Sequence, residues 1–247
     1  MRILLINPNT SRSLTDRLDA AARQVLSPGT TLESVTATVG VPYISTRTEA
    51  LVGGVQVLDI LAERHQEFDA AIVAAFGDPG LGAARELFDI PVVGLAEAGM
   101  LTACMLGGKF AIVTFAQALG PWYQECVDWH RMAPRCAGIF MAEGAFRSVD
   151  EVQTEKEEAL VALSQKAITE GEADVIVLAG APLSGLAGTI RDRLAVPVVD
   201  CAQAALRQAE TLAALRPRGA EAGSFRRPAA KPSVGLSPAL ERRIAWT

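Results

Sequence analysis

Two segments rich in glycine and proline carry the residues of this chain that are best placed for chemistry. Phe76-Gly77-Asp78-Pro79-Gly80 directly follows an apolar run that ends at Ala75, and Gly180-Ala181-Pro182 follows a run that ends at Ala179. In an open α/β sheet, ligands bind in the crevice outside the carboxyl ends of the strands. Glycine-rich turns at such ends can point backbone N–H groups at an oxyanion, which suits an enolate-like intermediate. We therefore expect a binding site between these two segments.

Several side chains near strand ends have two possible roles. Asp78 either holds its own turn by accepting backbone N–H bonds or carries a proton, and Cys201 either lies near the cleft or is a small buried helix residue. Asn7 either hydrogen-bonds a substrate carbonyl or shapes the turn before the next proline, and Phe76 is either a wall facing the substrate or part of the core. The residues that we expect to contact substrate are Asn7, Ser45, Thr46, Ala75, Phe76, Gly77, Asp78, Thr114, Gly180, Ala181 and Pro182. Asp78 and Cys201 are weak candidates for a catalytic role.

Length and charge exclude several classes of protein. The chain has 247 residues, half of them apolar, which is enough for one large or two small domains. Its formal net charge is -5 and it has no basic stripe, so we expect neither nucleic acid nor membrane as a partner. The N-terminal apolar run Ile3–Ile6 is shorter than the roughly 7–15 residues of a signal-peptide core. We therefore expect a cytoplasmic protein that binds a small molecule.

The chain has no recognisable cofactor or metal motif. Residues 77–82 do not form a GxGxxG sequence, and no phosphate-binding GxxxxGK[ST] loop occurs. The four cysteines lack CxxC spacing and are expected to be free thiols. With only two histidines in the chain, we expect no metal site.

Short apolar runs alternate with longer amphipathic segments, which is typical of a parallel sheet covered by helices. After a strand at 2–6, the polar residues Asn9, Thr10 and Ser11 provide N-cap oxygens for the first helix. Further strands are expected at 31–38, 70–75, 91–93, 109–114, 135–141, 174–179 and 197–200. Further helices are expected at 47–63, 80–88, 96–106, 119–130 and 150–169.

The pattern of elements repeats along the chain. The clearest match pairs Pro91-Val92-Val93 and its following helix with Pro197-Val198-Val199, and two other strand matches occur in the same order. We infer a duplication into subdomains 1–106 and 107–210. Residues 211–247 are expected to form a crossover segment and a short helix, with Ser237 as N-cap and Pro238 at the first helical position, that packs back on the body. The predicted fold is two flavodoxin-like parallel α/β subdomains related by a pseudo-two-fold axis, with the site in the cleft between them.

Four motifs give the chain a family resemblance. They are Asn7-Pro8-Asn9-Thr10-Ser11, Phe76-Gly77-Asp78-Pro79-Gly80-Leu81, Pro91-Val92-Val93-Gly94 with Ala96-Glu97-Ala98, and Gly223-Ser224-Phe225 with Pro228. With them the sequence resembles the aspartate/glutamate/hydantoin racemase superfamily, in particular its hydantoin and allantoin racemase branch. The resemblance implies two α/β subdomains, a cofactor-free site between them, two cysteines as paired acid and base, and a homo-oligomer.

The sequence departs from this resemblance at both cysteine positions. Ala75 stands where the first cysteine is implied and Gly180 where the second is implied, and neither residue can carry a proton. We therefore expect that the two-cysteine mechanism does not operate here. The leading hypothesis is an isomerase-like protein of this family that acts on a ureide, hydantoin or amino-acid derivative through an enolate-like intermediate. The alternatives are a decarboxylase or lyase on the same scaffold, or a homologue that binds small molecules without turnover.

Overall fold

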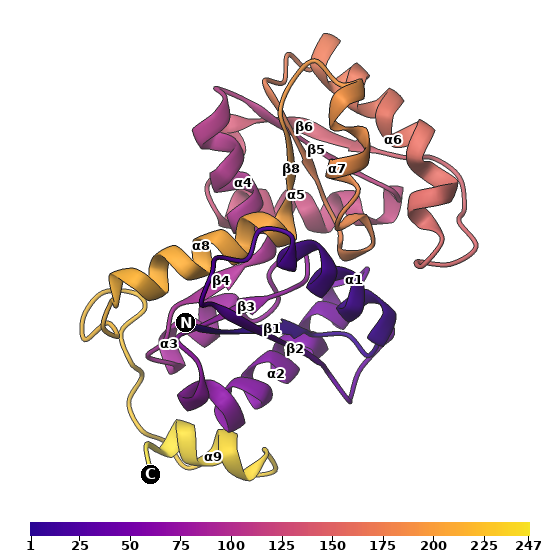
Figure 1. The fold of residues 1–247 in the computed structure, drawn as a ribbon. Coiled ribbons are helices and arrows are strands. Elements are labelled where there is room, and N and C mark those ends of the chain that lie inside the picture. The colour runs from indigo at the N-terminus through magenta and orange to yellow at the C-terminus, as the bar shows by residue number, and fades with distance from the viewer.

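Two four-stranded sheets form the cores of two similar halves (Figure 1). The computed structural model describes all residues, 1–247. The strand order is β2-β1-β3-β4 in the first sheet and β6-β5-β7-β8 in the second, and all neighbouring strands are parallel. The same order in two successive halves confirms the predicted fold class of two similar parallel α/β units.

The strands are β1 (Arg2–Asn7), β2 (Thr31–Thr36), β3 (Ala70–Val73), β4 (Val92–Gly94), β5 (Phe110–Thr114), β6 (Cys136–Met141), β7 (Val175–Leu178) and β8 (Val198–Asp200). The helices are α1 (Arg12–Arg23), α2 (Arg47–Arg64), α3 (Leu81–Leu87), α4 (Leu95–Leu106), α5 (Gly120–Trp129), α6 (Val152–Thr169), α7 (Ala187–Ile190), α8 (Cys201–Leu215) and α9 (Pro238–Ala245). Strands β3, β5 and β7 are buried along their whole length, since helices cover both faces, and they therefore read as continuous apolar runs.

Side chains fix the start of the helices beside the strand ends. At α2, the Thr46 hydroxyl accepts the Glu49 N–H while the Glu49 carboxylate accepts the N–H groups of Ser45 and Thr46, which forms a capping box. At α8, the Asp200 carboxylate accepts the N–H groups of Ala202 and Gln203. These bonds determine where each turn ends and its helix begins.

The two halves exchange their last helices. Helix α4 follows β4 of the first sheet but packs on β5, β7 and β8 of the second sheet, and α8 follows β8 but packs on β1, β3 and β4. The two exchanged helices also pack on each other, and α8 lies across the junction of the halves in Figure 1. Helix α8 continues to Leu215, beyond the boundary predicted at residue 210. The division at 106 and 210 stays a prediction, and α4 and α8 form the connection on which the halves meet.

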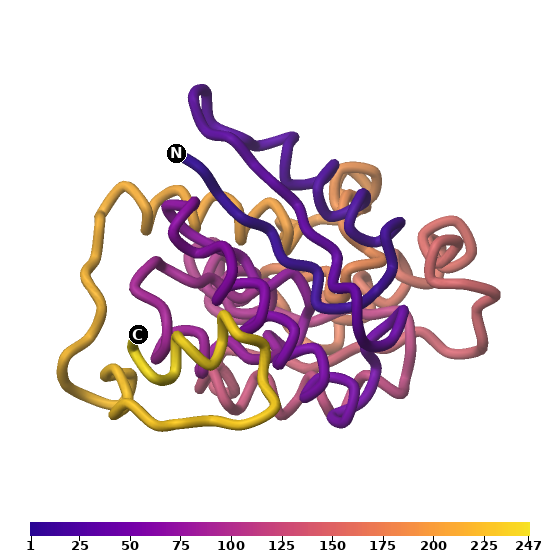
Figure 2. Tube along the Cα trace, turned by 90° about the horizontal axis from the view of Figure 1, so that it is seen from below, coloured from indigo at the N-terminus to yellow at the C-terminus, as the bar shows by residue number.

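The C-terminal segment wraps around the first half (Figure 2). Residues 216–236 contain no helix or strand, and α9 packs on α2 and buries Leu240. Ser237 caps α9 by accepting the Leu240 N–H, and Pro238 begins the helix, as the sequence predicts. No helix of the protein is both long enough and apolar enough to cross a membrane.

Candidate functional site

Ala75 and Gly180, at the two strand ends, lie in the wall of one small cavity between the halves. Its lining comprises Asn9, Tyr43, Ile44, Ala75, Phe76, Trp122, Tyr123, Gly180 and Ala181. The solvent-accessible volume is about 10 Å³, which is room for about one water molecule. The structure is therefore closed around this point, and a substrate is admitted only when the surrounding walls move apart.

The backbone at Gly180 leaves no room for a side chain. Its φ is +111°, a conformation that residues with a Cβ rarely adopt. A Cβ atom at this position would be 2.9 Å from Cε1 of Phe115 and 3.3 Å from the hydroxyl oxygen of Tyr123. At the other position where a cysteine is implied, Ala75 contributes only a methyl group. Proton transfer in this cavity therefore requires groups other than residues 75 and 180.

Tyr43 brings a hydroxyl to the cavity wall that has no hydrogen-bond partner. Burial, and then the nearby Glu49 carboxylate, raises the pKa of Tyr43 far above its ordinary value. The hydroxyl therefore stays protonated at neutral pH and keeps its proton to donate. An unsatisfied buried hydroxyl costs about 1–3 kcal/mol, which a ligand carbonyl in the cavity would relieve.

Tyr123 provides an acceptor from the second half. Its ring packs on Phe76, with the ring centroids 4.5 Å apart, and burial raises the pKa of Tyr123 well above its ordinary value. Its hydroxyl interacts with that of Thr114, which donates its own proton to the Ala179 carbonyl at 2.9 Å. The phenolic oxygen of Tyr123 can accept a hydrogen bond from an N–H group in the cavity.

Asn9 adds a second donor beside the end of β1. Its Oδ1 accepts the Asn7 Nδ2 at 3.0 Å and the Ser11 N–H at 2.9 Å, which fixes the orientation of the amide. The Nδ2 group of Asn9 is thereby left available at the cavity wall. Asn7 itself is fully buried and also donates to Thr15, so it positions Asn9 and does not line the cavity.

Asp78 does not line this cavity and instead joins the two halves. Its carboxylate accepts the N–H groups of Ala96 at 2.8 Å and Glu97 at 2.9 Å at the start of α4. It also accepts a hydrogen bond from Nε2 of His130, at 2.9 Å, at the end of α5. Asp78 thus holds α4 and the second half, whereas the sequence suggested that it holds its own turn.

Two further charged groups complete this cluster. Nδ1 of His130 lies 3.5 Å from Glu97, whose carboxylate also pairs with Arg85. Burial lowers the pKa of His130, but the hydrogen bonds and charges of Asp78 and Glu97 outweigh burial and raise that pKa to about 9. Burial raises the pKa of Glu97, but His130 and Arg85 outweigh it and lower that pKa to about 2. The cluster is therefore charged at neutral pH.

Asp78, Cys126 and His130 form the one group of side chains whose donor atoms lie close enough to hold a metal ion, within 4.8 Å of one another. Cys126 of α5 and His130, which follows the last residue of that helix, are four residues apart, so the sequence does pair His130 with a second possible ligand at helical spacing. Both ring nitrogens of His130 face carboxylates, Nε2 towards Asp78 at 2.9 Å and Nδ1 towards Glu97 at 3.5 Å. The group is therefore built as a hydrogen-bonded ion pair, and we assign it no metal.

Four of the predicted site residues line the cavity: Ala75, Phe76, Gly180 and Ala181. Gly77 and Asp78 belong to the turn beside it, and Ser45 and Thr46 are bound to Glu49. Three predicted residues, Asn7, Thr114 and Pro182, are not part of the lining. The carbonyl of Pro182 accepts a hydrogen bond from the Gln153 side chain at 2.9 Å.

Cys201 does not reach the cavity. It is the first residue of α8, 4% exposed, and its thiol donates to the Leu178 carbonyl at 3.3 Å. Burial, and then the neighbouring Asp200, raises the pKa of Cys201 well above its ordinary value. It is the small buried helix residue that was the alternative prediction.

The lining residues that were not named individually as expected contacts are Asn9, Tyr43, Ile44, Trp122 and Tyr123. Trp122 and Tyr123 follow Pro121 in the first turn of α5. Two adjacent aromatic residues at a helix start beside a strand end are a signal that the sequence offers. Which of their faces meets the cavity depends on the packing of the two halves.

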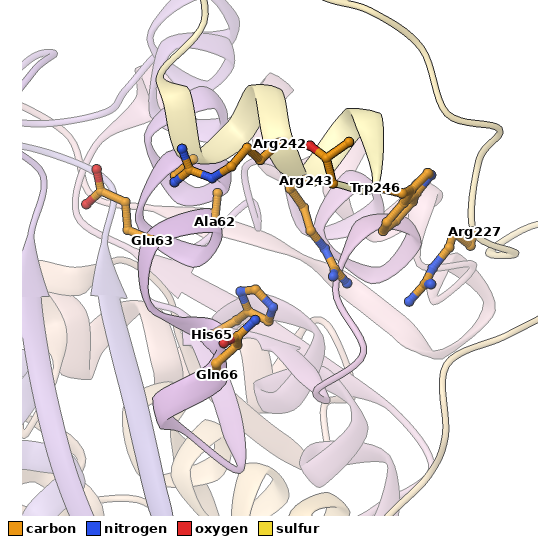
Figure 3. A pocket seen from close by; sticks show the side chains of 10 residues that line it. Ala62, Glu63, His65, Gln66, Arg227, Arg242, Arg243 and Trp246 are labelled. Atoms are coloured by element: carbon orange, nitrogen blue, oxygen red, sulfur yellow. The ribbon is translucent and has the colours of Figure 1, made fainter.

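A larger pocket lies away from the strand ends, between α2 and α9 (Figure 3). Its volume is about 400 Å³, and it contains three arginines and His65. Arg227 and Arg243 both pair with Asp89 and lie over the ring of Trp246. Arg227 and Arg243 therefore hold the C-terminal segment, and we do not assign a ligand to this pocket.

Comparison with known proteins gives consistent matches over nearly the whole chain. The family model described as Asp/Glu/Hydantoin racemase matches residues 3–209. A hydantoin racemase of Paenarthrobacter aurescens is 34% identical over 233 residues, covering 94% of this chain and 99% of that protein. The structure of an allantoin racemase from Klebsiella pneumoniae superimposes with a TM-score of 0.90 at 33% identity, covering 98% of this chain and 99% of that chain. Unliganded arylmalonate decarboxylase, at 17% identity and a TM-score of 0.59, covers 98% of this chain and 99% of its own, and shares the fold alone.

Proposed function

Because the chain belongs to the Asp/Glu/hydantoin racemase family, we propose that it binds a small neutral ureide, of the hydantoin or allantoin type, and promotes proton exchange at its acidic carbon. The family match confirms the resemblance that the motifs predicted. The observation that carries the proposal is the buried, unpaired hydroxyl of Tyr43 at the wall shared by Ala75 and Gly180.

The hydrogen-bonding groups of the cavity support a ureide as the ligand. Tyr43 and Asn9 offer donors and Tyr123 offers an acceptor, which complements a carbonyl next to an N–H group. No lysine or arginine is among the lining residues, so the cavity has no cation to neutralise a carboxylate. This favours a neutral ring over free aspartate or glutamate.

The same groups support chemistry through an enolate. When the proton leaves the carbon next to the carbonyl, negative charge develops on the carbonyl oxygen, and a donor already in place there stabilises it. Tyr43 keeps its proton because burial raises its pKa, so it acts as that donor. No carboxylate, thiol or neutral imidazole lines the cavity. The carbon proton therefore passes to a water-derived base, and the exchange rate rises with hydroxide concentration without a plateau at a thiol pKa.

Deuterium incorporation tests the proposal. Hydantoin, 5-methylhydantoin, allantoin, aspartate and glutamate are incubated with the protein in heavy water, and loss of the carbon-bound proton is followed by NMR. We expect exchange on at least one neutral ureide and none on the amino acids, with Tyr43→Phe slowing it at least tenfold. Absence of exchange above the buffer rate on all neutral ureides overturns the proposal.

A second candidate reaction is decarboxylation, which is favoured by the presence of proton donors without a base. Loss of CO₂ from a substituted malonate generates an enolate directly, so it needs a donor but no base. The apolar walls, Ile44, Phe76 and Trp122, disfavour the charged carboxylate and thus promote its loss. Release of CO₂ from 2-substituted malonates, without exchange on ureides, would select this reaction.

We also propose that the protein works in the cytoplasm as a homo-oligomer. All four cysteines are free thiols, as in proteins of reducing compartments. Apolar side chains are exposed on α2 and on α4, with Leu51 at 76% and Met105 at 75%. Light scattering of the purified protein tests the association, and a monomer at micromolar concentration contradicts it.

A further inference from the structure

Helix α5 carries both the wall of the cavity and the strongest polar contact between the halves. Trp122 and Tyr123 line the cavity at its first turn, and His130 follows its last residue. Tyr123, Cys126 and His130 lie at spacings of three and four residues, so they share one face of the helix. This face is turned towards the Phe76–Gly80 turn of the first half, since His130 binds Asp78 and Tyr123 packs on Phe76.

Two ion pairs connect α5 to the first half, and burial distinguishes them. Arg47 of α2 pairs with Glu125 of α5, but these side chains are 61% and 55% exposed. The side chains of His130 and Asp78 are only 3% and 1% exposed. Exposed pairs contribute little because water screens them, whereas loss of one partner from a buried pair leaves an uncompensated charge. The contact of His130 with Asp78 is therefore the one that decides whether α5 stays docked.

The contact lies where the chain begins to cross between the halves. Asp78 also accepts the N–H groups of Ala96 and Glu97 at the start of α4, so the turn, α4 and the end of α5 meet at one point. Trp122 packs so closely on the turn that a Cβ atom on Gly77 would lie within the indole ring's contact distance. Undocking of α5 would therefore remove Trp122 and Tyr123 from the cavity and open the space between Ala75 and Gly180.

We propose that His130 is a positioning residue, whose imidazolium on Asp78 holds α5 against the Phe76–Gly80 turn and thereby closes the substrate cavity. Only the identity of the substrate rests on the proposed function, since the closure itself is a property of the fold. His130 touches no ligand-facing group of the cavity and acts through α5. The groups facing the imidazole are Asp78 of the turn, Glu97 of α4 with Arg85 of α3 behind it, and Cys126 of its own helix.

Hydrogen–deuterium exchange of the free protein tests the closure without any substrate. The variants are His130→Ala, His130→Lys, which keeps a positive charge, and Glu125→Gln, which breaks the exposed pair on the same helix. We expect His130→Ala to speed exchange at least fivefold in peptides covering 75–82 and 117–131, while peptides of β1 and β3 stay protected. His130→Lys is expected to restore protection partly, and Glu125→Gln to match the unchanged protein.

Steady-state kinetics on the ureide that exchanges provides the second readout. Substrate enters the open form and is then held when α5 docks, so loss of the docking contact weakens the closed complex while the reaction within that complex is unchanged. We expect His130→Ala to raise KM at least tenfold and to change kcat less than threefold. Faster exchange in every peptide, or no change in the two named segments, overturns the proposal. Absence of turnover in the unchanged protein is a failure of the proposed function alone, because the exchange measurement still stands.

Discussion

The hydroxyl oxygen of Tyr123 lies 3.3 Å from the point at which a Cβ atom of residue 180 would stand. A side chain at this position, where the resemblance implies the second cysteine, would also lie 2.9 Å from the Phe115 ring. The packing around residue 180 is therefore fitted to glycine.

Gly180→Cys should consequently destabilise the protein. The left-handed backbone costs roughly 1–2 kcal/mol for a residue with a Cβ, and crowding by Phe115 and Tyr123 adds about 1–3 kcal/mol. Ala75→Cys should cost less than about 1 kcal/mol, since residue 75 already carries a Cβ. Urea unfolding of the variants measures both differences.

Gly185→Cys is the matched control for that experiment. Gly185 also has a positive φ, +91°, but no atom lies within 4 Å of the position of a Cβ atom. The loss of unfolding free energy in Gly185→Cys therefore measures the cost of the backbone conformation without crowding. Equal losses at 180 and 185 would show that crowding by Tyr123 and Phe115 contributes nothing.

Tyr43→Phe should stabilise the free protein while it impairs exchange. The change removes a buried hydroxyl that has no partner, so we expect the free energy of unfolding to rise by about 1 kcal/mol. Tyr123→Phe removes a hydroxyl that interacts with Thr114 and should lower that free energy by about 1 kcal/mol. Denaturant titration of the two variants decides the signs, and a loss of stability in Tyr43→Phe would mean that its hydroxyl has a partner in the free protein.

Stability should fall on the alkaline side because of His130. Its pKa is raised from an ordinary 6.5 to about 9, so its contribution is complete below pH 6.5 and is lost as the pH rises through 9. The difference corresponds to at most roughly 3 kcal/mol. Thermal unfolding between pH 6 and 10 measures the decline, which should flatten in His130→Gln. An equally steep decline in that variant would assign the effect to other groups.

Asp89→Ala should loosen the C-terminal segment. Asp89 pairs with Arg227 and Arg243, which hold Trp246 between them, but its side chain is 52% exposed. We therefore expect a stability loss of less than about 1 kcal/mol, together with faster tryptic cleavage between residues 216 and 227. Asp192→Ala, which breaks only an exposed pair with Arg191, serves as the control. Unchanged cleavage in Asp89→Ala would show that α9 packing alone holds the segment.

The sequence by itself determined the local structure and the absence of both implied cysteines. Apolar runs such as Ala71–Val73 and Val175–Leu178 predict buried strands, and Ser237 with Pro238 predicts a helix start. Such elements can be predicted because their signals come from neighbouring residues in the chain. The repeated order of runs gave the two halves, and Ala75 and Gly180 could be identified as unable to carry a proton from their residue types alone.

Only the tertiary structure decided which side chains fill the space between Ala75 and Gly180. Tyr123 meets Gly180, and His130 meets Asp78, across 57 and 52 residues of chain, and no local pattern encodes such contacts. The unpaired hydroxyl of Tyr43, the place of Tyr123 at the cavity wall, and the carboxylates that raise the pKa of His130 all depend on how the two halves pack together. Hydrogen-bond partners and pKa values depend on three-dimensional surroundings, and those are fixed only when the two halves close on each other.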